Sequence, residues 1–230
     1  MEKLKRSWLA AAMVVIFGMT SAKQSVARDL KTGLKIEIHV YNYSAVSAET
    51  LARAELETAR IFGRVRVATL WVVCPPTSQE EVPNKGCAFP DTSTRFTLRL
   101  FSNVTANRGR IGPDVFGYAL LPANEEFGLV ANVYADRVRE LLIGGESAGV
   151  TLGRVITHEL GHLLLGKNAH SAAGIMHTPW RSEDLELHRG GLMLFMPGEA
   201  KRIRAQVLAR MSSAAPGNSF VLTRRRGLLA

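Results

Sequence analysis

Residues 155–165 read VITHELGHLLL, and this stretch organises the rest of the chain. His158 and His162 are four residues apart, so on a helix they lie one turn apart on the same face and both imidazoles can point at one ion. Glu159 follows the first histidine, where its carboxylate can reach a water at that ion rather than the ion itself. The segment is otherwise apolar, and a buried helix excludes ionisable side chains unless they are paired or bind metal. The pattern predicts a zinc site on a helix, rather than surface or core histidines that match the motif by chance.

A catalytic zinc site needs a third protein ligand. His170 is the nearest candidate beyond Gly166, and it opens the stretch HSAAGIMH at residues 170–177. His177 is the next candidate. Three later carboxylates offer a different third ligand: Glu183, Asp184 and Glu186. Zinc lowers the pKa of a bound water to roughly 7, and Glu159 can take its proton and pass it to a leaving amine.

These residues resemble, in type and order, the motif of the metzincin family of zinc endopeptidases, especially its matrixin branch. The family motif HExxHxxGxxH turns at its glycine to bring up a third histidine, and a later methionine turn forms a hydrophobic floor beneath the zinc. The positions that match are His158, Glu159, His162, His170-Ser171 and Met176. The resemblance implies one catalytic Zn²⁺, a peptide or protein substrate and Glu159 as general base and then acid. It covers residues 34–211, although only residues 158–177 are specific.

The spacing departs from the family pattern. Gly166 falls four residues after His162 instead of three, and His170 falls eight after it instead of six. Asn168 occupies the family's ligand position and is a poor zinc ligand. One added residue rotates the end of a helix by ~100°, and a second added residue in the loop can compensate. We therefore interpret HExxHxxxGxxxH as a lengthened motif with His170 as the third ligand.

Hydrophobic periodicity predicts one mixed α+β domain. Alternating or β-branched runs predict strands at residues 34–41, 65–73, 95–101, 117–121 and 129–134. Helical spacing and end signals predict helices at residues 47–62, 135–142, 150–165 and 197–211, the first capped by Ser47. The resemblance implies a mostly parallel sheet with an edge strand and an active-site helix, followed by a small C-terminal subdomain.

The same resemblance assigns substrate binding to one edge strand. In metzincins an extended peptide pairs with such a strand, so that backbone hydrogen bonds hold it while its side chains fill pockets. The corresponding residues here are Gly117, Tyr118, Ala119 and Leu120. An ordinary edge strand without this role is the alternative.

The two ends of the chain predict export and a tail. Residues 1–27 run from basic through apolar to small, which is typical of a secretory signal peptide cleaved after Ala22 or Ala27. An uncleaved anchor is the alternative. We expect a single catalytic domain at residues 28–211, a flexible basic tail at residues 212–230, and a secreted or periplasmic protein. The resemblance points to a bacterial host.

Two cysteines close a polar loop. In an oxidising compartment Cys74 and Cys87 are expected to form a disulfide. Free thiols or metal ligation are the alternatives, and neither cysteine has a metal-type partner nearby in the sequence.

The net charge is +9, of which residues 1–27 carry +3 and Arg224, Arg225 and Arg226 carry half of the rest. No basic stripe is interleaved with aromatic residues, so we expect no nucleic-acid partner. No stretch after the signal peptide is long and apolar enough to cross a bilayer, so we expect no stable membrane insertion after signal cleavage. We also expect a monomer. The sequence favours a secreted zinc-dependent endopeptidase. The alternatives are a zinc-binding or peptide-binding module without turnover, and a basic cell-envelope adhesion protein.

Overall fold

The computed structural model describes residues 33–76, 87, 92–122, 127–140, 147–180 and 193–213. The predicted signal peptide and the chain beyond residue 213 lie outside these residues. So does the turn expected at residues 123–126. Among the helices of the described part, none has the length and apolar character needed to cross a bilayer.

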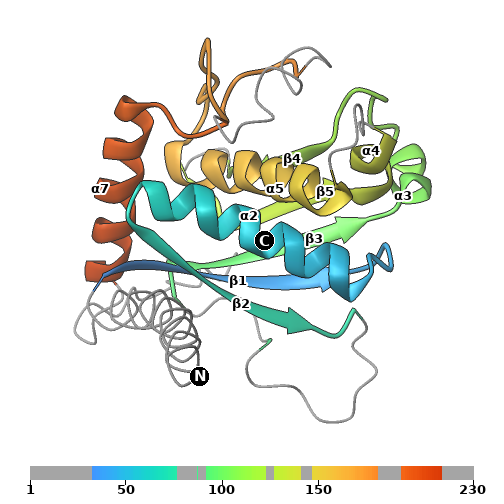
Figure 1. Ribbon diagram of the computed structural model, residues 1–230, viewed down its shortest axis with the longest axis horizontal. Helices are drawn as coiled ribbons and strands as arrows, with labels where there is room; N and C mark the ends of the chain where they lie inside the picture. The colour runs from blue at the N-terminus through green and yellow to red at the C-terminus, as the bar shows by residue number, and fades with distance from the viewer. Residues whose placement is uncertain are drawn as a thin grey trace, which may run out of the picture.

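A five-stranded sheet forms the centre of the domain, with the strand order β2-β1-β3-β5-β4 (Figure 1). Its strands are β1 (Leu34–Asn42), β2 (Val67–Cys74), β3 (Arg95–Phe101), β4 (Gly117–Leu120) and β5 (Val130–Tyr134). All neighbouring pairs are parallel except β4 with β5, which is antiparallel. The predicted α+β class and mostly parallel sheet are therefore confirmed.

Alternation in β1 decides which side chains enter the core. Ile36, Ile38 and Val40 have no exposed surface, because alternate residues of a strand point to the same face. The intervening polar residues point to the other face of the sheet. That side is not simply solvated, because His39 is only 1% exposed.

Two long helices cover one face of the sheet, α2 (Ala48–Arg64) and α5 (Ala148–Leu165) (Figure 1). Ser47 caps α2 as predicted, accepting a hydrogen bond from the Thr50 backbone N–H at 3.2 Å. Helix α5 begins two residues earlier than predicted, because Ser147 caps it through the backbone N–H of Val150. Nearly all of α5 is buried, which explains its apolar sequence.

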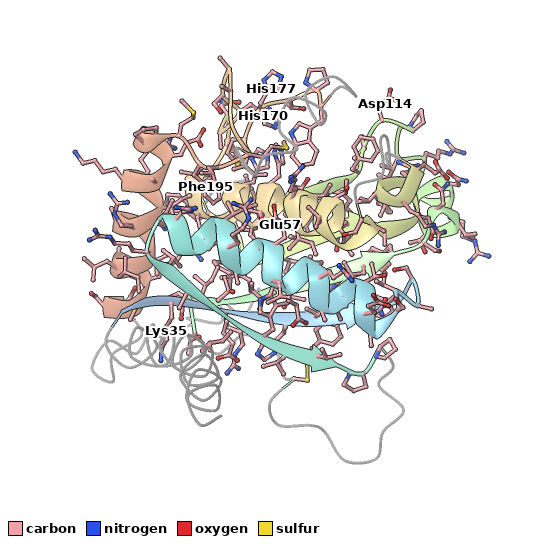
Figure 2. All side chains as sticks on the ribbon, viewed as in Figure 1. Lys35, Glu57, Asp114, His170, His177 and Phe195 are labelled. Atoms are coloured by element: carbon pink, nitrogen blue, oxygen red, sulfur yellow. A yellow bond between two sulfur atoms is a disulfide. The ribbon has the colours of Figure 1, made fainter. Side chains whose placement is uncertain are left out.

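Glycines let α2 and α5 approach closely. A Cβ on Gly149 would lie 2.4 Å from Cβ of Arg53, and one on Gly153 would lie 2.6 Å from the carbonyl oxygen of Ala54. Glu57 of α2 lies between these helices (Figure 2) and binds the buried Arg154 of α5 at 3.3 Å. The site helix is thus fixed to its neighbour by steric fit and by a buried ion pair.

The C-terminal helix α7 (Pro197–Ser213) packs against the end of α5. Arg202 donates to the carbonyl oxygen of Leu165 at 2.6 Å, and Arg210 donates to that of Leu163 at 2.8 Å. The helix continues two residues beyond the predicted Met211. The hydroxyls of Ser212 and Ser213 each donate to a carbonyl oxygen of the preceding turn.

Two short helices complete the described fold, α3 (Asn103–Arg108) and α4 (Ala135–Glu140). Helix α4 was predicted, but α3 was not. The backbone N–H of Asn103 donates to Asp136 of α4 at 3.0 Å, whereas the local cap residue Ser102 makes no side-chain cap. A helix capped from a distant segment leaves no local signal. The predicted disulfide joins Cys74 at the end of β2 to Cys87.

Candidate metal centre

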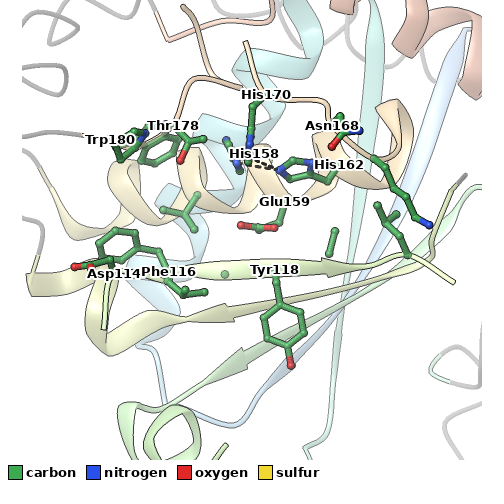
Figure 3. A pocket seen from close by; sticks show the side chains of 17 residues that line it. Asp114, Phe116, Tyr118, His158, Glu159, His162, Asn168, His170, Thr178 and Trp180 are labelled. Atoms are coloured by element: carbon green, nitrogen blue, oxygen red, sulfur yellow. Dashed lines mark hydrogen bonds between the residues drawn. The ribbon is translucent and has the colours of Figure 1, made fainter. Parts of the chain in front are cut away.

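Three histidines converge at the C-terminal half of α5. The Nε2 atom of His162 lies 3.1 Å from Nε2 of His158 and 3.1 Å from Nε2 of His170 (Figure 3). Two nitrogens bound to one tetrahedral zinc lie about 3.3 Å apart, given zinc–nitrogen bonds of about 2.0 Å. These two separations therefore fit a single zinc ion, and all three ligand nitrogens lie within 4.8 Å of one another.

Backbone carbonyls orient two of these rings. Nδ1 of His158 lies 2.8 Å from the carbonyl oxygen of Ile175, and His162 is hydrogen-bonded to the backbone of Gly166. A ring that donates from Nδ1 keeps its lone pair on Nε2. Metal-binding histidines are commonly held by such second contacts, so this donor set fits the metal chemically as well as spatially.

Burial keeps the histidine cluster neutral. The pKa of His158 is lowered to about 4, mainly by burial; the hydrogen bond to Ile175 opposes this shift, and the charges of His162 and His170 add to it. Burial lowers the pKa of His162 to about 4 as well, with the charge of His170 adding to the effect against the Gly166 hydrogen bond. The pKa of His170 is also lowered by burial. All three imidazoles offer lone pairs at neutral pH.

The lengthened spacing is absorbed at the end of α5. The helix ends at Leu165, Gly166 has φ 82° and Asn168 has φ 57°. Glycine and asparagine are the residues that adopt positive φ at least cost. The chain thus turns back over the helix and brings His170 to His162. This agrees with the interpretation that the second added residue, in the loop, offsets the rotation caused by the added residue in the helix. Asn168 has a conformational role here and also lines the pocket.

Met176 packs against the site helix. It is fully buried, and a Cβ on Gly161 would lie 2.5 Å from its sulfur. The preceding residue, Ile175, donates its backbone N–H to Leu194 at 2.9 Å. This turn therefore supports α5 from the same segment that orients His158.

Glu159 lies between the histidine cluster and β4 (Figure 3). It is 6% exposed, and burial raises its pKa to about 8. A Cβ on Gly117 would lie 2.9 Å from Oε1 of Glu159, so the glycine at the start of β4 makes room for this carboxylate. The carboxyl group is thus held in a buried position beside the histidine cluster.

A cavity of about 790 Å³ opens over these side chains. Its walls come from β4 and the segment before it, from α5, and from the loop that follows α5. The lining residues are Asp114, Val115, Phe116, Gly117, Tyr118, Ala119, Leu121, Val155, His158, Glu159, His162, Lys167, Asn168, His170, Thr178, Pro179 and Trp180.

Two parts of this pocket were missed from the sequence. Trp180 packs edge-on against His158 with 5.5 Å between ring centroids, and the segment 114–116 forms the wall beside β4. Neither belongs to a motif. The nearest signal for Trp180 is its place three residues after the HSAAGIMH stretch.

The alternative third ligands divide into two groups. His177 does not join the group of converging nitrogens, and its Nδ1 lies 3.3 Å from the carbonyl oxygen of Ser171. Figure 2 shows His170 and His177 together on the segment above α5, yet His170 alone turns to the cluster. Glu183, Asp184 and Glu186 lie outside the described residues.

Comparison with known proteins gives a single kind of match. No family model matches the chain, and no curated protein matches it. The fold is similar to the crystal structure of archaemetzincin from Methanopyrus kandleri, with a TM-score of 0.45 and 14% sequence identity, over 77% of this chain and 98% of that one. At this level of likeness, the function of the chain has to be argued from its own residues.

Proposed function

We propose that this chain is a zinc-dependent peptidase that acts outside the cytoplasm, with His158, His162 and His170 holding one Zn²⁺. The observation that carries the proposal is the convergence of three neutral imidazole nitrogens in a pocket that also contains the buried carboxyl group of Glu159. A purely structural zinc site is closed by a fourth protein ligand and needs no base. The pocket and Glu159 favour turnover over storage or structural binding.

Zinc held there would lower the pKa of a water to roughly 7 and would polarise a substrate carbonyl. Glu159 would accept the proton of the attacking water and return it to the leaving amine. The raised pKa of this carboxyl group suits both steps, because a group that titrates near neutral pH gives and takes a proton readily.

The geometry around β4 supports a peptide as substrate. β4 lies at the end of the strand order, with β5 as its partner. Gly117, Tyr118 and Ala119 line the same pocket as the histidines. An extended peptide could add as a strand beside them, which would bring its backbone carbonyls to the histidine cluster.

The test is cleavage of a mixed peptide library by the full chain beside Glu159→Gln, with zinc content measured for both. Removing the general base should lower the turnover by at least ~100-fold while zinc stays at one per chain. Equal turnover by the two proteins would refute the mechanism. Bound zinc without cleavage by either protein would favour the binding module.

A matched pair of histidines tests the third ligand. His170→Gln should weaken zinc binding sharply, because it leaves two ligands. His177→Gln, in the same loop but outside the converging group, should leave zinc affinity unchanged. The opposite result would move the third ligand to His177.

A further inference from the structure

A second cluster of ligand-type side chains lies on the other face of the sheet. Figure 2 shows Lys35 on the side of β1 away from α2, and alternation places Glu37 and His39 on the same side. The carboxylate of Glu37 contacts Nε2 of His39. Arg95 of β3 donates to the same carboxylate at 3.0 Å.

The register of β1 with β2 brings sulfur to this histidine. Tyr41 pairs with Cys74, so the two side chains share a face. The Sγ atom of Cys74 lies 3.9 Å from Nδ1 of His39, and the ligand atoms of His39, Cys74 and Cys87 all lie within 4.8 Å of one another. No metal-type partner lies near either cysteine in the sequence, but strand pairing brings His39 to both of them in the structure.

His39 presents Nε2 to the carboxylate of Glu37 and Nδ1 to the sulfur of Cys74. When Nε2–H donates to a carboxylate, the lone pair resides on Nδ1. That lone pair faces a sulfur which, in a disulfide, has no hydrogen to donate. A carboxylate on one ring nitrogen is also the arrangement that orients a metal-binding histidine through the other. Glu37 and His39 are thus arranged for a ligand that the oxidised protein does not offer.

We propose that reduction of the Cys74–Cys87 disulfide creates a second zinc site, in which both sulfurs and Nδ1 of His39 hold one Zn²⁺ while Glu37 orients the imidazole. A dithiol supplies two electrons and two protons to the S–S bond and becomes a cyclic disulfide. Each cysteine thiol then loses its proton to solvent as Zn²⁺ binds, and the zinc keeps its oxidation state.

The donor set fits this ion, and the two sulfurs, which are bonded to each other in the disulfide, must separate to share it. Thiolate and imidazole are preferred zinc ligands, with Zn–S near 2.3 Å and Zn–N near 2.0 Å. Tetrahedral angles then imply a sulfur–nitrogen separation of about 3.6 Å, close to the 3.9 Å between Cys74 and His39. The site is independent of the histidine cluster on α5, which has no sulfur donor.

The test measures metal content of the full chain before and after treatment with dithiothreitol and anaerobic desalting. Zinc per chain should rise by one on reduction, together with two titratable thiols. With Co²⁺ as the probe, the reduced protein should gain a thiolate-to-metal charge-transfer absorption that the oxidised protein lacks. This absorption reports the sulfur site alone, so the result does not depend on the proposed peptidase activity.

Variants separate the two sites. Cys74→Ser combined with Cys87→Ser should abolish the added zinc and the absorption, and His170→Gln should leave both unchanged. Glu37→Gln should weaken the second zinc by ~10-fold or more. Glu49→Gln, which removes an exposed carboxylate that pairs with Arg53, is the matched control and should have no effect.

Three results would overturn the proposal. One is a reduced protein with two free thiols and no added metal. Another is a disulfide that the dithiol does not open in the folded chain. The third is a His39→Gln variant that, when reduced, binds the second zinc as tightly as the unmodified protein.

Discussion

The histidine cluster joins two regions that are held in different ways. His158 and His162 lie on α5, which is enclosed by the sheet, α2 and α7. His170 lies on the segment that follows α5, an exposed position fixed by two residues with positive φ. A substitution that adds a steric clash in a buried helix is expected to lower the stability of the whole fold. In a loop of this kind, a similar substitution is expected to change only the local structure of the site.

The largest expected effect is in the helical region. Gly153→Ala should lower the free energy of unfolding by about 2 kcal/mol, because the new Cβ would lie 2.6 Å from the Ala54 carbonyl oxygen and the helices must separate. Chemical denaturation monitored by circular dichroism measures the change. Gly63→Ala in α2 is the matched control, because nothing lies within 4 Å of its Cβ position. This substitution should raise the free energy of unfolding by a few tenths of a kcal/mol, since alanine favours a helix more than glycine does. Equal effects of the two substitutions would mean that α2 and α5 are not in close contact.

The loop region should respond locally and less strongly. Asn168→Ala places an alanine at a position with positive φ. Alanine lacks the polar side chain that lets asparagine adopt this conformation, so the substitution should cost about 1 kcal/mol. If that conformation is needed to place His170, zinc affinity should fall about fivefold, as measured by competition with a chromophoric chelator. Asn168→Gly should retain the affinity. A loss of the same size in Asn168→Gly would assign the effect to the asparagine side chain instead of to the backbone.

The same division explains what could be predicted from the sequence. The pair on α5 could be identified because helical periodicity alone places His158 and His162 together. The position of His170 depends on backbone torsions at Gly166 and Asn168, so the sequence left His177 and the later carboxylates as alternatives. Strand lengths followed from alternation, and most predicted boundaries lie within two residues of those in the structure.

What escaped prediction was set by contacts between distant segments. Helix α3 receives its cap from Asp136, and His39 meets Cys74 through the register of two strands. Trp180 lines the pocket because it packs edge-on against His158. Periodicity and motif spacing describe neighbours along the chain, so they carry no information about these pairings.

The last prediction concerns the protons that are released when zinc binds, and which of the two regions releases them. The pKa values of His158 and His162 are lowered to about 4, so at pH 7 these ligands are already neutral and release nothing. Glu159, with its pKa raised to about 8, is protonated in the metal-free protein at that pH. A nearby dication favours the carboxylate, so zinc uptake should release about one proton.

The ionisation of Glu159 should therefore make zinc affinity rise by about tenfold per pH unit between pH 6 and 7.5. Calorimetric titration of the metal-free protein in buffers with different ionisation enthalpies counts the protons. Glu159→Gln should release about one proton fewer per zinc than the unmodified protein, with the ionisation of the zinc-bound water as the remaining source. Equal proton release by the two proteins would instead mean that Glu159 is already ionised in the metal-free protein, so that its burial between α5 and β4 does not raise its pKa above neutral pH.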